Sequence, residues 1–287
     1  MAAERLRVRK TYKLAIGGAF PRSESGRSYP VSDPSGELLA HAAQASRKDA
    51  RDAVTAARKA FPGWWAATAY NRGQVIYRIA EVLEGRRDQL AAEVAAAAGS
   101  ELPAARAQVD ESIDRIVWYA GWADKFAQIA GSANPVAGPY FNFSSPEPTG
   151  VVAILAPQES SLLGFVSVLA PVLCTGNSAV IVASQARPLP AASLAEVLAT
   201  SDLPGGVANV LTGLTAELAP WLASHRDVNA LDLTGADPAA RRDLARAAAD
   251  TVKRVYVPRD EDWGRDPGLE RLTAFVETKT VWHPIGL

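Results

Sequence analysis

The sequence predicts an α/β protein whose mainly parallel sheet is covered by helices on both faces. Between Gly150 and Val257, short apolar segments alternate with helical ones, which is the pattern of βαβ units. The first third is helical in character, and 48% of the 287 residues are apolar, which is ample material for a core. No apolar run approaches the roughly 20 residues that a membrane-spanning helix needs.

Three amphipathic helices are expected in the first third. The first begins at Asp49 and is ended by Pro62-Gly63, the second covers Arg72 to Leu90, and the third runs from about Ala104 to Ile129. Upstream of them, the segment from Ala15 to Leu39 is rich in Gly, Ser and Pro and favours short strands and turns.

The remaining two thirds of the chain contain the strands of the sheet. A Pro-rich segment with aromatic residues, 134–149, favours an extended ribbon, and Glu277–His283 favours a terminal strand. The sheet strands are expected at Val151–Leu155, Ala179–Val182, Ala208–Leu211, Asn229–Leu233 and Arg254–Val257, with helices at Ser160–Cys174, Ala191–Thr200, Thr215–Ser224 and Pro238–Thr251.

Charge and composition exclude several function classes. Lys and Arg total 30 against 31 for Asp and Glu, and this balance gives no general attraction to nucleic acid or to an anionic membrane. A single cysteine allows no internal disulfide and favours a reducing, cytoplasmic location. The three histidines, His41, His225 and His283, lie on different expected elements without metal-ligand spacing, so no metal site is predicted.

Several sequence strings occur in an order found in one enzyme family. IGGAF (16–20), YAGWADKF (119–126), VLCTGNSAVIV (172–182), LPGGVANVLTG (203–213) and LDLTGAD (231–237) follow one another along the chain. Together they resemble the aldehyde dehydrogenase superfamily. The resemblance implies a Rossmann-like, NAD-binding fold with an oligomerisation arm made of a β-ribbon and the C-terminal strand.

The resemblance also divides the chain into parts. Residues 1–133 correspond to the N-terminal strands and helices of the cofactor domain, 134–149 to the oligomerisation ribbon, and 150–258 to the Rossmann-like portion. Residues 259–287 correspond to a linker and the C-terminal oligomerisation strand. The family's catalytic domain, which normally lies before that strand, has no counterpart here, so we expect a truncated, pseudoenzyme-like member.

The residues at the family's catalytic positions do not match the family pattern. Cys174 is the only cysteine, but it lies in the apolar helix of the cofactor domain, where a buried core thiol is expected. Glu159 occupies the place of the family's oxyanion-donating Asn, and an ionised carboxylate cannot donate a hydrogen bond. The sequence therefore predicts a chain that is catalytically inactive alone.

The cofactor positions that the resemblance identifies are degenerate as well. Val182 and Gln185 stand where the family has a Lys and a Glu for the adenosine ribose. The turn near the pyrophosphate reads Gly235 to Ala240, without the family's second Gly and its Ser, and Asp237 brings a negative charge there. We therefore expect no cofactor, with residual NAD binding as the alternative.

The parts with which family members associate are present. The resemblance assigns this role to residues on the ribbon and the terminal strand: Tyr140, Phe141, Phe143, Lys279, Val281 and Trp282. The leading hypothesis is a non-catalytic subunit that pairs with a full-length aldehyde dehydrogenase, although self-association stays open. The alternatives are a nucleotide-binding module without catalysis and an NAD-dependent aldehyde oxidoreductase that is active only in a complex.

Overall fold

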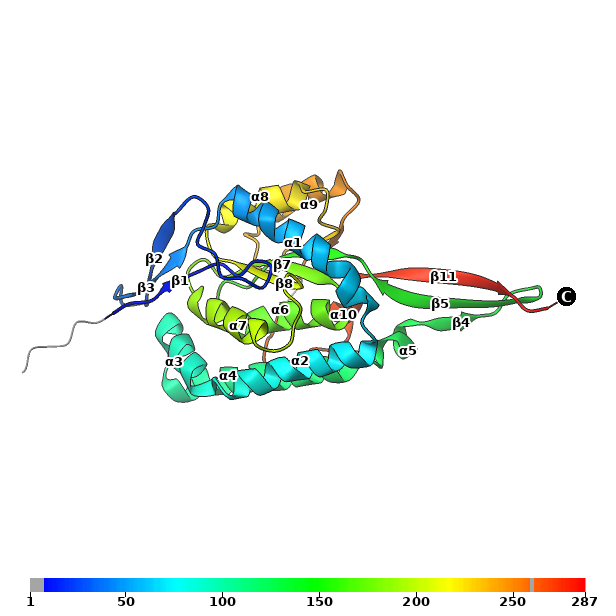
Figure 1. The fold of residues 1–287 in the computed structure, drawn as a ribbon, viewed down its shortest axis with the longest axis horizontal. Helices are drawn as coiled ribbons and strands as arrows, with labels where there is room; N and C mark the ends of the chain where they lie inside the picture. The colour runs from blue at the N-terminus through cyan, green and yellow to red at the C-terminus, as the bar shows by residue number, and fades with distance from the viewer. Residues whose placement is uncertain (1–7, 259–260, 287) are drawn as a thin grey trace, which may run out of the picture.

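The computed structural model describes residues 8–258 and 261–286. Its centre is a five-stranded parallel sheet of order β10-β9-β6-β7-β8, flanked by a small N-terminal sheet and by a ribbon that projects from the body (Figure 1). The strands are β6 (Val151–Leu155), β7 (Ser178–Val182), β8 (Ala208–Leu211), β9 (Ala230–Asp232) and β10 (Arg254–Tyr256). The predicted α/β fold with a mainly parallel, Rossmann-like sheet is confirmed.

Helices cover both faces of this sheet, and for that reason its strands are almost continuously apolar. Along β6, Val151, Ala153 and Leu155 pack into one core cluster, whereas Val152 and Ile154 pack into the other. The first cluster is completed by α1 (Arg47–Ala66), α8 (Thr215–Ser224) and α9 (Arg241–Ala249), which lie together on one side in Figure 1. The second is completed by α2 (Ala69–Glu84), α3 (Arg87–Ala98), α4 (Leu102–Trp122), α6 (Leu163–Cys174) and α7 (Leu189–Ala199).

The first helix does not end at Pro62-Gly63, so that prediction is wrong. Helix α1 continues through Pro62 to Ala66. Proline removes one backbone donor from a helix, but tertiary packing outweighs the local cost here. Trp64 is fully buried in the last turn, and its Nε1 donates to the carbonyl of Leu173 at 3.1 Å. This contact holds the helix end against α6.

Two other predicted helices are each divided in the structure. The helix expected at 72–90 is two helices in the structure, α2 and α3, which are separated by Gly85 and Arg86. Helix α3 continues to Ala98. The expected helix at 104–129 ends at Trp122, and the short α5 (Phe126–Ala130) follows. Lys125 stabilises the break, because its Nζ donates to the carbonyl of Gly121 at 2.7 Å.

The predicted ribbon and terminal strand pair with each other. Strand β5 (Tyr140–Pro148) lies between β4 (Ser132–Asn134) and β11 (Val276–Pro284). The antiparallel register of β11 with β5 runs from Val276 opposite Pro148 to Pro284 opposite Tyr140. This three-stranded ribbon extends well beyond the body of the molecule (Figure 1).

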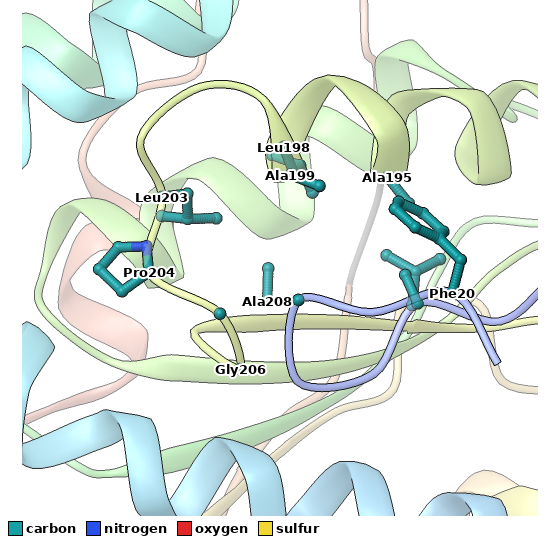
Figure 2. Close-up of a pocket in the computed structure, with 12 residues that line it drawn as sticks. Phe20, Ala195, Leu198, Ala199, Leu203, Pro204, Gly206 and Ala208 are labelled. Carbon is teal, nitrogen blue, oxygen red and sulfur yellow. The ribbon is translucent and has the colours of Figure 1, made fainter.

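The N-terminal segment forms a small sheet and a loop that closes against the end of α7. The sheet contains β1 (Thr11–Tyr12), β3 (Leu38–Ala43) and β2 (Ser28–Ser32). A Cβ on Gly18 would come within 2.9 Å of the Cα of Gly205, so this close backbone approach requires glycine. Figure 2 shows the pocket beside that contact, lined by Phe20, Leu198 and Leu203 among others. At about 20 Å³ the pocket has room for no more than a water molecule.

A buried arginine, Arg271, holds the segment after β10 against the central sheet. Helix α10 (Glu270–Ala274) packs against α6, and Leu272 and Phe275 enter the core. Arg271 is buried and forms ion pairs with Asp232 at 3.0 Å and with Glu261 at 2.6 Å. This network anchors the connection between the sheet and the ribbon.

No helix among residues 8–258 and 261–286 is both long enough and apolar enough to cross a membrane. The four-part division of the chain stays a prediction, and its residues 1–7, 259, 260 and 287 lie outside the described residues.

Candidate cofactor site

Two adjoining cavities lie at the carboxyl ends of the central strands. The larger has a volume of about 570 Å³ and the smaller about 380 Å³, and both are lined by Gln158, Gly235 and Ala236. These residues follow β6 and β9, the two neighbouring strands at the centre of the sheet. In open parallel sheets, ligands bind in the crevice outside the carboxyl ends of the strands. The volumes are within the usual range for small-molecule sites.

The larger cavity is mainly apolar. Its walls come from the ends of β6 and β9 and from the first turns of α8 and α9, and they include Leu155, Ala216, Ala219, Pro220, Pro238 and Leu244. Polar lining comes from Gln158, Gln185, Asp237 and Thr215, and Thr215 Oγ1 is buried without a hydrogen-bond partner among the described residues. An apolar cavity with an unsatisfied hydroxyl is suited to a flat heterocycle with polar edges.

The smaller cavity is lined by charged residues. Glu159 lies at its rim and pairs with Arg187 at 3.0 Å, and Glu261 pairs with the buried Arg271. Arg241 also lines this cavity but has no ion pair within the described part of the chain. Its Nη2 reaches only the carbonyl of Thr234, at 3.5 Å, and its buried Nε has no partner there.

Two glutamines and one glycine hold the loops that form the cavities. The Gln158 side chain donates to Ala156 O at 2.9 Å and accepts the Gln185 backbone N–H at 2.9 Å, which joins the loops after β6 and β7. The Gln185 side chain in turn accepts from Thr215 N at 3.4 Å. A Cβ on Gly235 would lie 1.8 Å from Ala156 O, so only glycine permits this turn beside β6.

The degenerate cofactor positions are brought together only in part. Gln185, Gly235 and Ala240 line the larger cavity, whereas Val182 is buried at the end of β7 and is not among the lining residues. Glu159 is largely exposed at the rim of the smaller cavity. Asp237 lines the larger cavity, and its carboxylate accepts the Ala239 backbone N–H at 2.9 Å.

Cys174 lies far from solvent at the end of α6. Its side chain is 1% exposed and donates from Sγ to Tyr119 O at 3.2 Å. Burial raises the pKa of the Cys174 thiol to about 12, although the neighbouring Arg72 opposes this shift. The thiol is therefore protonated at neutral pH and lines neither cavity.

The six residues assigned to oligomerisation all lie on the ribbon. Tyr140 and Trp282 are 42% and 59% exposed, and their rings meet edge to face at 5.7 Å. Phe141, which is also exposed, packs against Phe143 at a ring separation of 5.5 Å. On the same ribbon, Val281 pairs with Phe143, and Lys279 Nζ forms an ion pair with Glu147 at 3.0 Å. The ribbon thus presents a set of exposed aromatic side chains.

The model of the aldehyde dehydrogenase family matches residues 20–258. The chain belongs to this family. It is 34% identical to the mitochondrial benzaldehyde dehydrogenase of Antirrhinum majus, over 85% of this chain and 46% of that protein. It is 32% identical to the cytosolic aldehyde dehydrogenase 1 of Elephantulus edwardii, over 85% and 49%. The chain spans about half the length of the curated relatives it matches.

Solved aldehyde dehydrogenase structures have the same fold. HpcC from Thermus thermophilus superposes with a TM-score of 0.80 at 33% identity, covering 86% of this chain and 47% of that one. The NAD⁺ complex of an aldehyde dehydrogenase from Bacillus cereus also gives a TM-score of 0.80, at 26% identity and with coverages of 86% and 50%. The chain thus corresponds to about half of each of these structures.

Two predictions are contradicted by these comparisons. The sequence predicts a chain that is not an enzyme, but its relatives are named as dehydrogenases and the family is enzymatic. It also predicts no cofactor, but the matching structure of the same family from Bacillus cereus is an NAD⁺ complex. Both predictions relied on a few side-chain positions, whereas the larger cavity is mainly apolar. The cytoplasmic location stays a prediction, because the relatives' names include both cytosolic and mitochondrial proteins.

The residues present fit a dinucleotide. The larger cavity offers apolar walls and the unsatisfied Thr215 hydroxyl, and the smaller one offers the Arg241 guanidinium. The resemblance does not point to either residue, because both lie outside the strings that resemble the family. The one sequence feature that points to Arg241 is its position at the start of a helix after the turn at Gly235. Arg242 has the same feature, so the sequence does not distinguish the two arginines.

Proposed function

We propose that this chain supplies the NAD(H)-binding and subunit-association parts of an aldehyde dehydrogenase. It works in the NAD-dependent oxidation of an aldehyde, together with a subunit that carries the family's catalytic domain. The NAD(H)-binding part of this proposal is supported by the two adjoining cavities at the carboxyl ends of the parallel strands. When bound, NAD⁺ would supply the hydride acceptor, and this chain's residues would bind and orient the cofactor.

The larger cavity is suited to the adenosine half of the cofactor. Its apolar walls accept the adenine ring, and Gln158, Gln185 and Thr215 in the same lining supply polar groups for the ring edge. The smaller cavity, with Ser160, Thr234 and Trp263 in its lining, is left for the rest of the dinucleotide.

Titration of the purified chain with NADH, followed by fluorescence and calorimetry, tests this assignment. Saturable binding is expected for the wild type. Ala216→Trp fills the larger cavity from the exposed first turn of α8 and should abolish binding. Ser224→Trp is the matched control, because it places the same side chain at the exposed far end of the same helix. A wild-type chain that binds no NADH, or an unchanged affinity in Ala216→Trp, would overturn the assignment.

Support for the partner comes from the ribbon. Strand β11 is bonded to β5 on one side and has no strand on its other side among the described residues. Open strand edges are sites for adding a further strand, and exposed aromatic side chains such as Trp282 are typical of interfaces. We infer that this edge joins the sheet of a catalytic domain in a full-length family member. A second copy of this chain is the alternative.

A further inference from the structure

Each acidic side chain that lines the smaller cavity already has an arginine partner. Glu159 is paired with Arg187, and Glu261 with Arg271. Arg241 is the cation that remains. Within residues 8–258 and 261–286, it has neither a carboxylate at ion-pair distance nor a partner for its buried Nε. A guanidinium that lines a partly enclosed cavity without a counter-ion is suited to an anionic ligand.

The position of Arg241 identifies which part of a ligand it can reach. The two cavities meet at Gln158, Gly235 and Ala236, so a molecule that occupies both must cross this junction. Arg241 lines only the smaller cavity, whereas Ala240, the residue before it, lines the larger one. The guanidinium therefore lies beside the junction and not at the adenine end.

We propose that Arg241 binds the diphosphate that links the two halves of NAD(H). This inference rests on the proposed function. Guanidinium groups bind phosphate oxygens through paired, charge-assisted hydrogen bonds. Arg241 thus serves as a polar anchor in a chain that has Val182 in place of a lysine.

The test compares NADH, ADP and adenosine by calorimetry on the whole chain. The wild type should bind ADP more tightly than adenosine. Arg241→Gln should weaken ADP and NADH by roughly 10-fold to 100-fold and leave adenosine unchanged, because only the charged hydrogen bonds are lost. Arg242→Gln, a change of an exposed neighbour that lines neither cavity, should alter none of the three affinities.

The other outcomes separate the two proposals. If Arg241→Gln binds ADP and NADH as the wild type does, the role of Arg241 is overturned while NADH binding stands. If Arg241→Gln weakens adenosine by the same factor, the residue only shapes the site, and its assignment to the diphosphate is wrong. If the wild type binds neither NADH nor ADP, both proposals fail.

Discussion

At the scale of single residues, Arg271 has a positive charge that is buried inside the protein. Its guanidinium is bonded to Asp232, Thr234 and Glu261 and lies 4.6 Å from the centre of the Tyr256 ring. Burial alone would lower the pKa of Arg271, but Asp232 and Glu261 outweigh it and raise the pKa. Removing one partner of such a pair leaves an uncompensated buried charge. Arg271 therefore stabilises the connection between β9 and the ribbon.

Replacing Arg271 by Met should lower the free energy of unfolding by about 3–5 kcal/mol, because Asp232 loses its counter-charge. Urea denaturation of the purified variant measures the loss. Asp232→Asn combined with Arg271→Met should restore part of it, since both charges are then absent. Arg265→Gln, at an exposed arginine, is the control and should change little. A loss of less than about 1 kcal/mol in Arg271→Met would contradict the structural role.

Cys174 gives a second prediction at this scale. The buried thiol, with its pKa raised to about 12, should not react with a thiol-specific reagent while the protein is folded. Labelling at increasing urea concentrations should follow the unfolding transition seen by circular dichroism. Rapid labelling of the native protein would show that the thiol is accessible and would contradict its position at the end of α6.

At the scale of elements, the start of α1 depends on a capping box. The Ser46 side chain accepts hydrogen bonds from Lys48 N and Asp49 N. The Asp49 carboxylate in turn accepts from Ser46 N and from Ser23 Oγ, and both of these bonds are 2.7 Å long. Burial alone would raise the pKa of Asp49, but these hydrogen bonds outweigh it, and the pKa is lowered. The ionised carboxylate is therefore part of the folded structure.

Asp49→Ala should cost about 1–2 kcal/mol at neutral pH. Because the pKa of Asp49 is lower in the folded state than in the unfolded one, its contribution is fully present above the unfolded value of about 3.9. It is lost as the pH falls through the folded pKa, so the gap between wild type and variant should narrow in acid. Asp52→Ala, at an exposed position of the same helix, should have little effect at either pH. A gap that does not change with pH would contradict the assignment.

Elements also differ in how well the sequence predicts them. Strands β6 and β7 are recognisable because burial on both faces makes them nearly continuous apolar runs between helices. The end of α1 is not, because the packing of Trp64 against Leu173 outweighs the local signal of Pro62. The candidate site is less predictable still. Its walls come from segments that follow all five central strands, so the surroundings of Arg241 are visible only after folding.

At the scale of the whole molecule, the segment that contains α10 connects the cofactor-type body with the projecting ribbon. The buried Arg271 network fixes that connection beside the smaller cavity, because Glu261 both pairs with Arg271 and lines the cavity. The connection therefore links the base of the ribbon, where Val276 pairs with Pro148, to the polar end of the proposed cofactor site. The exposed Tyr140 and Trp282 lie toward the opposite end of the ribbon.

Native mass spectrometry of the tagged chain, isolated from its own cell extract, tests the central claim most directly. The account predicts a complex that contains this chain of 30.3 kDa, a family member with a catalytic domain, and NAD(H). Trp282→Ser combined with Phe141→Ser, which removes exposed ribbon aromatics, should release the partner without unfolding the chain. Isolation of the wild-type chain alone, or only as multiples of itself, without NAD(H), would contradict the account.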